Sequence, residues 1–216
     1  ISISTFTKES KFVVEGTVSQ LMETLDNLDI AGTADNGAGY LDLGARGLKG
    51  KTEFFYRRGD GSSLYATRDV AYHQWKWGQS NRLINVLGED HKLQAKQVGM
   101  TLEELGSKRP EVLFYSFIKL PEGKMSTRKG NVVFMDDLLE EAHAQAAVVV
   151  KELRPDYGDE QIAAIAEAVG TAAVRFNIIK VSPEKGFTFR WEEALAFEAG
   201  SAPFIMYSHT RACSIS

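Results

Sequence analysis

The stretch GKMSTRKGN, residues 123–131, concentrates anion-binding groups in one short segment. Lys124, Arg128 and Lys129 supply positive charge, and Ser126 supplies a hydroxyl group. Glycine near each end gives the backbone the freedom to close over a bound group and to reopen. Cations stabilise a leaving phosphate best where its charge grows during the reaction. The segment therefore predicts a nucleotide-phosphate site, and a solvated lysine-rich turn is the alternative interpretation.

The elements around this segment indicate a sheet that could position it. Residues 82–87 (RLINVL) suit a buried parallel strand, residues 92–105 have helical spacing that ends before Gly106, and residues 111–120 suit a second strand. This strand–helix–strand order is typical of open α/β sheets, in which ligands bind beyond the carboxyl ends of the strands. We expect Gly88-Glu89-Asp90-His91 and the 124–131 loop to lie on the same edge.

The rest of the chain divides into an α/β part and a helical part. In the first part we expect a strand at 11–14, a helix at 17–28 with Thr17 as its N-cap, a strand at 40–43, a hairpin over 53–66 with its turn at 59–61, and a helix at 67–77. In the second part we expect helices at 136–153, 159–180 and 192–199, a short strand near 187–190, and a last helix from about Pro203. The predicted domains are residues 1–135 and 136–216.

Composition excludes several classes of protein. The chain has 216 residues, a net charge of −4, 44% hydrophobic and 25% charged residues, which is an ordinary globular balance. The single cysteine, Cys213, rules out an internal disulfide and fits a reducing compartment. The sequence shows no run of apolar residues long enough for a membrane helix and no secretory signal. We therefore expect a cytoplasmic protein without a membrane partner.

Several ordered blocks of the sequence resemble one family. Lys124-Met125-Ser126-Thr127-Arg128 resembles the KMSKS signature of class I aminoacyl-tRNA synthetases. Residues 64–73 (LYATRDVAYH) and 85–91 (NVLGEDH) are similar to blocks of the arginyl-tRNA synthetases. Residues 203–215 (PFIMYSHTRACSI) are similar to the helix that opens the anticodon-binding domain of that family. The resemblance implies a Rossmann-type α/β catalytic domain that activates arginine with ATP and Mg²⁺ and transfers it to tRNA(Arg).

The family implies roles for residues in these blocks. Tyr65, Asp69 and His91 would bind the arginine substrate, since a guanidinium group needs a carboxylate partner and tolerates an aromatic face. ATP would lie against Gly88, Asp90 and His91, with Glu89 nearby, and against Lys124, Met125 and Ser126. Residues 118–120 would hold the adenine through backbone groups. Without the family, Asp69 is a helix-start acid, Tyr65 a hairpin aromatic and residues 88–91 a tight turn.

The signature loop departs from the family pattern at one place. Lys124, Ser126, Arg128 and Lys129 are the predicted catalytic residues, which would stabilise the leaving pyrophosphate. Thr127 stands where a second lysine is usual, so the choice between Arg128, Lys129 and a lysine near the other signature of the family as its replacement stays open. Basic residues of the helical part are candidates for contact with tRNA: Arg154, Arg175, Lys180, Lys185 and Arg190.

The HIGH signature of class I synthetases does not occur in this sequence. The four histidines are His73, His91, His143 and His209. The chain begins ISISTFTKES and ends RACSIS within a predicted helix. We therefore expect an internal fragment that holds the second half of the active site, that has the N-terminal half of the same polypeptide as its partner, and that is inactive by itself.

Two other functions compete with this one. Residues 45–52 (ARGLKGKT) fit a relaxed P-loop, although that motif needs a buried strand before it and a helix after it. The chain could also be a non-catalytic RNA-binding module. No set of residues suggests a metal site, because His209 and Cys213 alone cannot enclose zinc.

Overall fold

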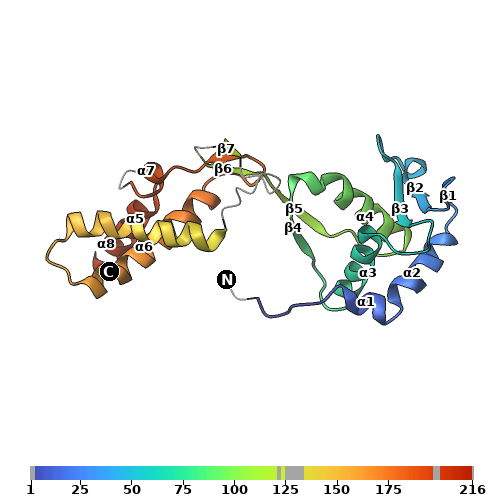
Figure 1. Ribbon diagram of the computed structural model, residues 1–216, viewed down its shortest axis with the longest axis horizontal. Helices are drawn as coiled ribbons and strands as arrows, with labels where there is room; N and C mark the ends of the chain where they lie inside the picture. The colour runs from blue at the N-terminus through green and yellow to red at the C-terminus, as the bar shows by residue number, and fades with distance from the viewer. Residues whose placement is uncertain (1–2, 121–122, 125–133, 197–199, 216) are drawn as a thin grey trace. The chain divides into compact units, whose positions relative to one another are not determined.

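Two hydrophobic cores divide the chain into two units, residues 1–114 and 115–216. The computed structural model describes residues 3–120, 123–124, 134–196 and 200–215 (Figure 1). The predicted functional border between residues 135 and 136 lies inside the second unit. A border set by packing does not test one set by function, so that division stays a prediction.

The first unit combines helices with short strands. Its elements in chain order are α1 (Ser10–Val14), α2 (Thr17–Asp26), β1 (Ala31–Thr33), β2 (Gly39–Asp42), η1 (Leu43–Arg46), β3 (Glu53–Arg57), α3 (Tyr65–Trp77), β4 (Ile84–Gly88), η2 (Glu89–His91), α4 (Lys92–Glu104) and β5 (Glu111–Tyr115). β1, β2 and β3 form an antiparallel sheet in that order, and β4 pairs with β5.

The core of the first unit lies between this antiparallel sheet and the helices. Along β3, Phe54 and Tyr56 are buried while Glu53 and Phe55 are exposed, which is the alternation that a one-sided strand requires. The buried side chains pack with Leu25 of α2 and Val70 of α3 in one cluster. Burial of each such side chain stabilises the fold by roughly 1.5–3 kcal/mol, so α3 is an integral part of the core.

Helix α3 is also fixed by polar and aromatic contacts. The hydroxyl of Thr67, which is fully buried, donates a hydrogen bond to the backbone oxygen of Tyr56 at 2.5 Å. Tyr72 and Trp75 stack on each other, and Phe12 of α1 packs against both rings. These contacts hold the orientation of α3 from β3 on one side and from α1 on the other.

The second unit is mainly helical. Its elements are β6 (Ile118–Leu120), β7 (Gly123–Lys124), α5 (Met135–Leu153), α6 (Asp159–Ile179), β8 (Phe187–Thr188), α7 (Trp191–Ala194) and α8 (Ala202–Ile215). β6 lies between β7, to which it is antiparallel, and β8, to which it is parallel. The buried residues that join these elements are Ala142, Ala173, Val174, Phe189, Ala194 and Ala202.

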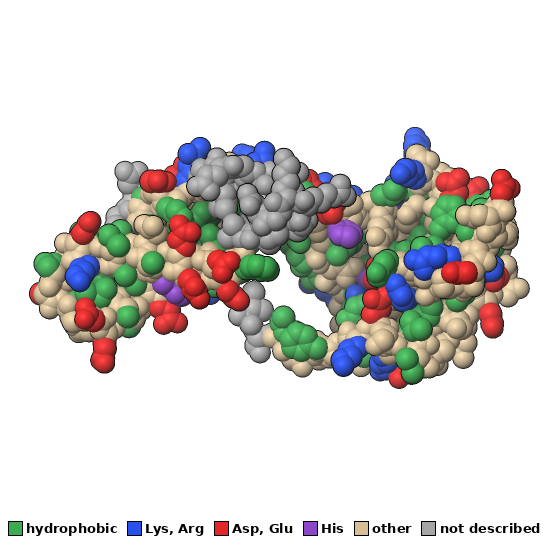
Figure 2. Space-filling model, viewed as in Figure 1, with side chains coloured by type: hydrophobic (Ala, Val, Ile, Leu, Met, Phe, Trp, Pro, Cys, Tyr) green, Lys and Arg blue, Asp and Glu red, His purple; other side chains and the backbone are tan. Residues whose placement is uncertain are grey.

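Helix α6 is more apolar than we expected from the sequence. α6 is long and apolar enough to cross a membrane, with a mean hydropathy of 1.5, although the sequence analysis predicted no such segment. The helices of soluble cores pass the same test, and one face of α6 is buried, including the polar Asn177. On the face shown in Figure 2, acidic side chains gather over α5 and α6.

Most predicted elements are present. The helices at 17–28, 67–77, 92–105, 136–153 and 159–180 correspond to α2, α3, α4, α5 and α6, and Gly106 has the left-handed backbone, φ 72°, expected after a helix. The strand at 40–43, the strand near 187–190 and the last helix correspond to β2, β8 and α8. The predicted helix at 192–199 is represented by α7, and residues 197–199 lie outside the described ranges.

Other predictions were wrong. Residues 11–14 form helix α1 and not a strand, because a short apolar run does not distinguish the two and only Phe12 is buried. The hairpin predicted over 53–66 forms its turn, but no full second strand follows within this described range. A single antiparallel bridge joins Arg57 and Ser63, and α3 begins at Tyr65. Gly16, with φ 78°, takes the N-cap position expected for Thr17.

The predicted strands at 82–87 and 111–120 also need correction. β4 pairs with β5 as expected, yet Ile84 is 54% and Val86 60% exposed, so β4 is not a buried strand. Residues 111–120 form two strands, β5 and β6, which belong to different sheets. The break falls at Ser116, whose backbone N–H donates to the oxygen of Pro183 at 2.8 Å and not to a strand neighbour.

Substitution by alanine should have opposite effects on stability at two glycines that lie inside helices. A Cβ on Gly170 of α6 would lie 2.8 Å from the backbone of Ala142 in α5, whereas a Cβ on Gly99 of α4 would meet only the Arg109 side chain at 3.4 Å. We expect Gly170→Ala to destabilise the helical unit by roughly 1–3 kcal/mol because α5 and α6 must separate. Gly99→Ala should be neutral or stabilising by up to about 1 kcal/mol, through helix propensity. Denaturant unfolding measures both, and a harmless Gly170→Ala would contradict the close approach.

Candidate functional site

Tyr65 and Asp69 stand on the same face of helix α3. The helix begins at Tyr65, after Leu64 in an extended conformation, so Tyr65 and Asp69 are separated by one helical turn. The Tyr65 residue is 68% exposed, and the Asp69 side chain is 37% exposed. Both side chains are therefore accessible to a ligand, while Thr67, Val70 and Ala71 on the opposite face are buried. This placement agrees with the pairing predicted from the sequence.

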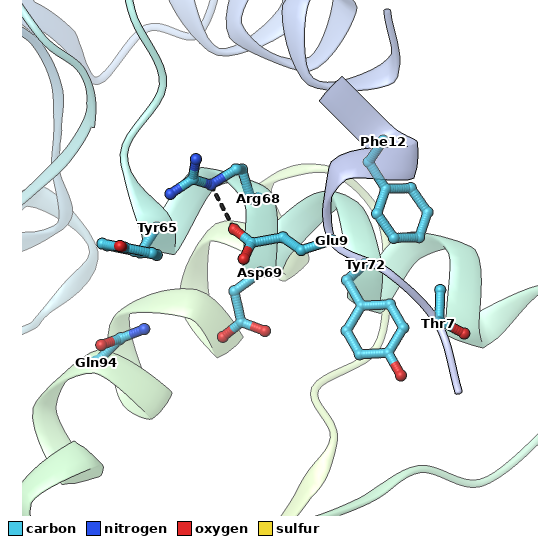
Figure 3. Close-up of a pocket in the computed structure, with 8 residues that line it drawn as sticks. All are labelled: Thr7, Glu9, Phe12, Tyr65, Arg68, Asp69, Tyr72 and Gln94. Carbon is cyan, nitrogen blue, oxygen red and sulfur yellow. Dashed lines mark ion pairs between the residues drawn. The ribbon is translucent and has the colours of Figure 1, made fainter. Parts of the chain in front are cut away.

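A cavity of about 280 Å³ opens beside this face of α3 (Figure 3). Small-molecule sites commonly have volumes of ~300–1,000 Å³, so this cavity suits a ligand of amino-acid size. Its lining comes from the N-terminal segment, α1, α3 and the first turn of α4. The lining residues are Thr7, Glu9, Phe12, Tyr65, Arg68, Asp69, Tyr72 and Gln94.

The charges around the cavity are divided between two carboxylates and one guanidinium group. Arg68 forms an ion pair with Glu9, and its guanidinium carbon lies 4.5 Å from the centre of the Tyr65 ring. Asp69 points away from this pair in Figure 3. Within the described part of the chain, no Lys or Arg forms an ion pair with Asp69. Asp69 is thus the carboxylate of the cavity that can accept a cationic ligand.

A buried histidine lies behind Asp69. The Nδ1 atom of His73 is 3.1 Å from Asp69 Oδ1, and the His73 side chain is only 4% exposed. Lys76, one turn of helix further in the same cluster, is half-buried. Desolvation lowers the pKa of the Lys76 ammonium group, and the negative charge of Asp69 partly opposes this effect.

The predicted ATP residues follow strand β4. Gly88 ends the strand, Glu89–His91 form the turn η2, and α4 begins at Lys92. The Asp90 and His91 side chains are 63% and 51% exposed, and His91 Nε2 lies 3.9 Å from Asp90 Oδ2. A Cβ on Gly88 would stand 2.5 Å from Asp90 Oδ1, so the absence of a side chain at Gly88 lets the carboxylate lie over the strand end.

Some predicted site residues are not brought to the cavity. His91 is not among the residues that line it, so its role in binding arginine is not supported by this geometry. Lys124 lies in β7 with its backbone opposite Lys119. Met125, Ser126, Thr127, Arg128 and Lys129 lie outside the described residues, so the predicted catalytic loop stays a prediction.

Sequence reasoning missed several residues of the cavity. Tyr72 could have been found, because it follows Asp69 by three residues on a helix and must share its face. Gln94, in the first turn of α4, could have been inferred from its position just after the predicted nucleotide residues. Thr7, Glu9 and Phe12 carried no local signal, since they reach the cavity only through packing of the N-terminal segment against α3.

The P-loop alternative lacks its structural context. Residues 45–52 begin in the 3₁₀ turn η1 and lead directly into strand β3, whereas a P-loop leads into a helix. Arg46 within this segment is held by ion pairs to Asp29 at 2.8 Å and to Glu104 at 2.9 Å. The segment is therefore a connection between strands that is fastened to α4.

The other candidate sites are weak. His209 and Cys213 lie on an exposed part of α8, with 3.7 Å between His209 Nε2 and Cys213 Sγ. Within the described residues no three His, Cys, Asp or Glu side chains form a group that could hold a metal ion. Among the basic residues proposed for tRNA, Arg154 is already paired with Asp156 and stacked on Tyr157, and Arg190 lies 3.7 Å from Glu193.

Comparison with curated proteins gives close relatives. The chain is 51% identical over 211 residues to the arginine–tRNA ligase of Methanocella arvoryzae, covering 97% of this chain and 37% of that protein. It is 48% identical over 210 residues to the arginine–tRNA ligase of Methanococcoides burtonii, covering 97% and 36%. The chain thus spans little more than a third of the length of these relatives.

Solved structures show the same fold. Thermus thermophilus arginyl-tRNA synthetase matches 96% of this chain and 41% of its own chain, with a TM-score of 0.81 and 26% identity. Arginyl-tRNA synthetase from Plasmodium falciparum matches the whole of this chain with a TM-score of 0.79, and its 16% identity supports the fold alone. These matches confirm the predicted fold class, an α/β part followed by helices.

A family profile described as tRNA synthetases class I (R), catalytic domain, matches residues 5–191. This range includes the whole cavity beside α3, the turn after β4 and the 123–131 segment. Together with the relatives above, it confirms the resemblance found in the sequence. The chain therefore belongs to the arginyl family of class I tRNA synthetases.

Proposed function

We propose that this chain supplies the arginine-binding pocket and part of the ATP site of an arginyl-tRNA synthetase. The observation that carries the proposal is the cavity beside α3, in which Tyr65 and Asp69 face a space of amino-acid size. Family membership makes arginine, ATP and tRNA(Arg) the expected substrates, with Mg²⁺ accompanying ATP. The cytoplasm remains the expected location. The N-terminal half of a longer polypeptide remains the expected partner.

Attachment of arginine to tRNA takes two steps. An oxygen of the arginine carboxylate attacks the α-phosphorus of ATP, which forms arginyl-adenylate and releases pyrophosphate. A terminal ribose hydroxyl of the tRNA then attacks the acyl carbon, loses its proton, and releases AMP. Binding groups that hold arginine rigidly contribute to the first step, because a reactive geometry converts a bimolecular encounter into an intramolecular one.

Asp69 is the group that recognises the side chain of the substrate. A guanidinium group forms two parallel hydrogen bonds to a carboxylate, which an ammonium group cannot do. Tyr65 and Tyr72 offer aromatic surface on the same face of α3. Arg68 lies over Tyr65 and pairs with Glu9, which leaves Asp69 as the carboxylate for the substrate.

The nucleotide would lie beyond the end of strand β4. Asp90 and His91 are exposed there and carry hydrogen-bonding groups suited to ribose hydroxyls. The 124–129 segment would neutralise the pyrophosphate as it leaves, with Lys124 and Ser126 in the usual places and Arg128 or Lys129 replacing the second lysine. Met125 would contact the nucleotide within the same loop.

Loss of the Asp69 charge should weaken arginine binding. We expect Asp69→Asn to raise the dissociation constant for L-arginine about 10–100-fold, since hydrogen bonds to charged groups contribute about 1.5–3 kcal/mol. Asp156→Asn, which removes an exposed carboxylate paired with Arg154, should leave the affinity unchanged. Isothermal titration calorimetry measures both variants. Equal affinities for arginine in Asp69→Asn and the unmodified chain would overturn the assignment.

The chain alone should not catalyse arginine activation. We expect no arginine-dependent exchange of labelled pyrophosphate into ATP by the 216-residue chain, because its sequence has no HIGH signature. Addition of the N-terminal part of the Methanocella arvoryzae relative provides the complementary test, and exchange should then appear. Pyrophosphate exchange by the chain alone, abolished by Asp69→Asn, would show that the HIGH signature is dispensable here.

The P-loop alternative has its own test. We expect Lys51→Ala to leave nucleotide affinity unchanged, because residues 45–52 lead into strand β3 and not into a helix. Gly88→Ala should weaken nucleotide binding, since the added Cβ displaces the Asp90 carboxylate. Titration with a fluorescent ATP analogue compares the two variants. A large loss of affinity in Lys51→Ala, with none in Gly88→Ala, would favour the P-loop.

A further inference from the structure

A closed hydrogen-bonding network lies behind the cavity, on the buried side of Asp69. Its centre is His73 of α3, whose ring nitrogens contact different groups. On one side, Nδ1 lies 2.7 Å from the backbone oxygen of Asp69 and 3.1 Å from its carboxylate Oδ1. On the other side, Nε2 lies 2.7 Å from Nδ2 of Asn85 and 3.2 Å from Nζ of Lys76. The imidazole thus joins the carboxylate of α3 to strand β4.

The partners of the ring determine which nitrogen carries the proton. Lys76 Nζ donates to Asn85 Oδ1 at 3.2 Å, which fixes the orientation of the Asn85 amide and turns its NH₂ group toward His73. Two donors therefore face Nε2, which must accept. Two acceptors face Nδ1, which must donate. The Nδ1–H tautomer satisfies all four contacts, whereas a proton on Nε2 would face two donors.

This arrangement restricts the Asp69 side chain. The Nδ1–H group lies 3.1 Å from Oδ1 and restrains that oxygen on the side of the helix, while Oδ2 and the second lone pair of Oδ1 stay available to a ligand. A bidentate guanidinium pair depends on the plane of the carboxylate, because both of its hydrogen bonds must lie close to it. We propose that His73 is a positioning residue that orients the Asp69 carboxylate toward the guanidinium group of the arginine substrate. This inference rests on the function proposed above.

Asn85 and Lys76 extend the hydrogen-bonding network of His73 to other parts of the site. Asn85 stands in β4, three residues before Gly88, so the network connects the arginine pocket with the strand that leads to the predicted ATP residues. Lys76 also lies 4.4 Å from the centre of the Tyr72 ring, which lines the cavity. His73, at the centre of the network, is 3% exposed, and Lys76 and Asn85 are partly buried, so the network is partly shielded from water. Shielding strengthens its hydrogen bonds and makes its geometry more rigid.

Two variants separate positioning from a merely structural role. His73→Asn keeps a donor near the Nδ1 position but removes the acceptor for Asn85 and Lys76. His73→Gln places an amide near the Nε2 position and leaves Asp69 without its donor. We expect His73→Gln to raise the arginine dissociation constant about tenfold, which corresponds to the loss of one positioning hydrogen bond. His73→Asn should stay within about threefold of the unmodified chain, even where its thermal stability is lower.

The control and the spectroscopic test use the same chain. His143→Gln alters another partly buried histidine, which contacts Thr171 in the helical unit, and should leave arginine affinity unchanged. Long-range ¹H–¹⁵N correlation spectra of the His73 ring should show the Nδ1–H tautomer. An Nε2–H tautomer, or equal arginine affinity in His73→Gln and the unmodified chain, would overturn the proposal.

The arginine pocket and the role of His73 can be refuted separately. If the unmodified chain binds arginine more tightly than Asp69→Asn does, and His73→Gln matches the unmodified chain, the role of His73 is refuted while the arginine pocket stands. If Asp69→Asn and the unmodified chain do not differ, or neither binds arginine, both proposals are refuted. If His73→Asn and His73→Gln lose affinity equally and in proportion to their loss of thermal stability, His73 is structural only.

Discussion

The position of helix α3 is the constraint on which the candidate site depends. Its inner face enters the core through Val70 and Thr67, and Thr67 is also tied to the backbone of Tyr56 in β3. Once that face is fixed, helical geometry places Tyr65, Asp69 and Tyr72 on the outer face, toward the cavity. A rotation of the helix by one residue would turn Asp69 about 100° away. Packing of apolar side chains therefore sets the direction in which the Asp69 carboxylate points.

The N-terminal segment completes the site from the other side. Phe12 anchors α1 on the rings of Tyr72 and Trp75, and this contact brings Glu9 beside Arg68. Without this segment the outer face of α3 would be an open surface, on which an ion pair contributes little because water screens it. With the segment in place, the charged groups are partly enclosed, and their interactions with a ligand are stronger.

The sequence predicted the parts of the site that follow from local periodicity and from family blocks. Tyr65 and Asp69 were identified from the family resemblance, and their four-residue spacing agrees with a shared helical face. Long helices such as α5 and α6 were equally clear. The errors fall on short segments, such as residues 11–14, where one buried side chain decides between helix and strand. Glu9 and the exposed β4 strand depend on contacts between distant residues, which a pattern within one segment cannot encode.

The pairing of charges leaves one carboxylate of the cavity for the guanidinium ligand that we propose. Arg68 engages Glu9 and lies over Tyr65, which leaves Asp69 as the carboxylate available to a cation. A lysine side chain would satisfy the charge of Asp69, but its ammonium group would make no parallel pair of hydrogen bonds and would gain less from an aromatic face. The orientation of Asp69 then matters more than its charge, because only the planar group is sensitive to the carboxylate plane. Discrimination between arginine and lysine would thus originate in the buried contacts that hold Asp69 and not in the charge of the cavity.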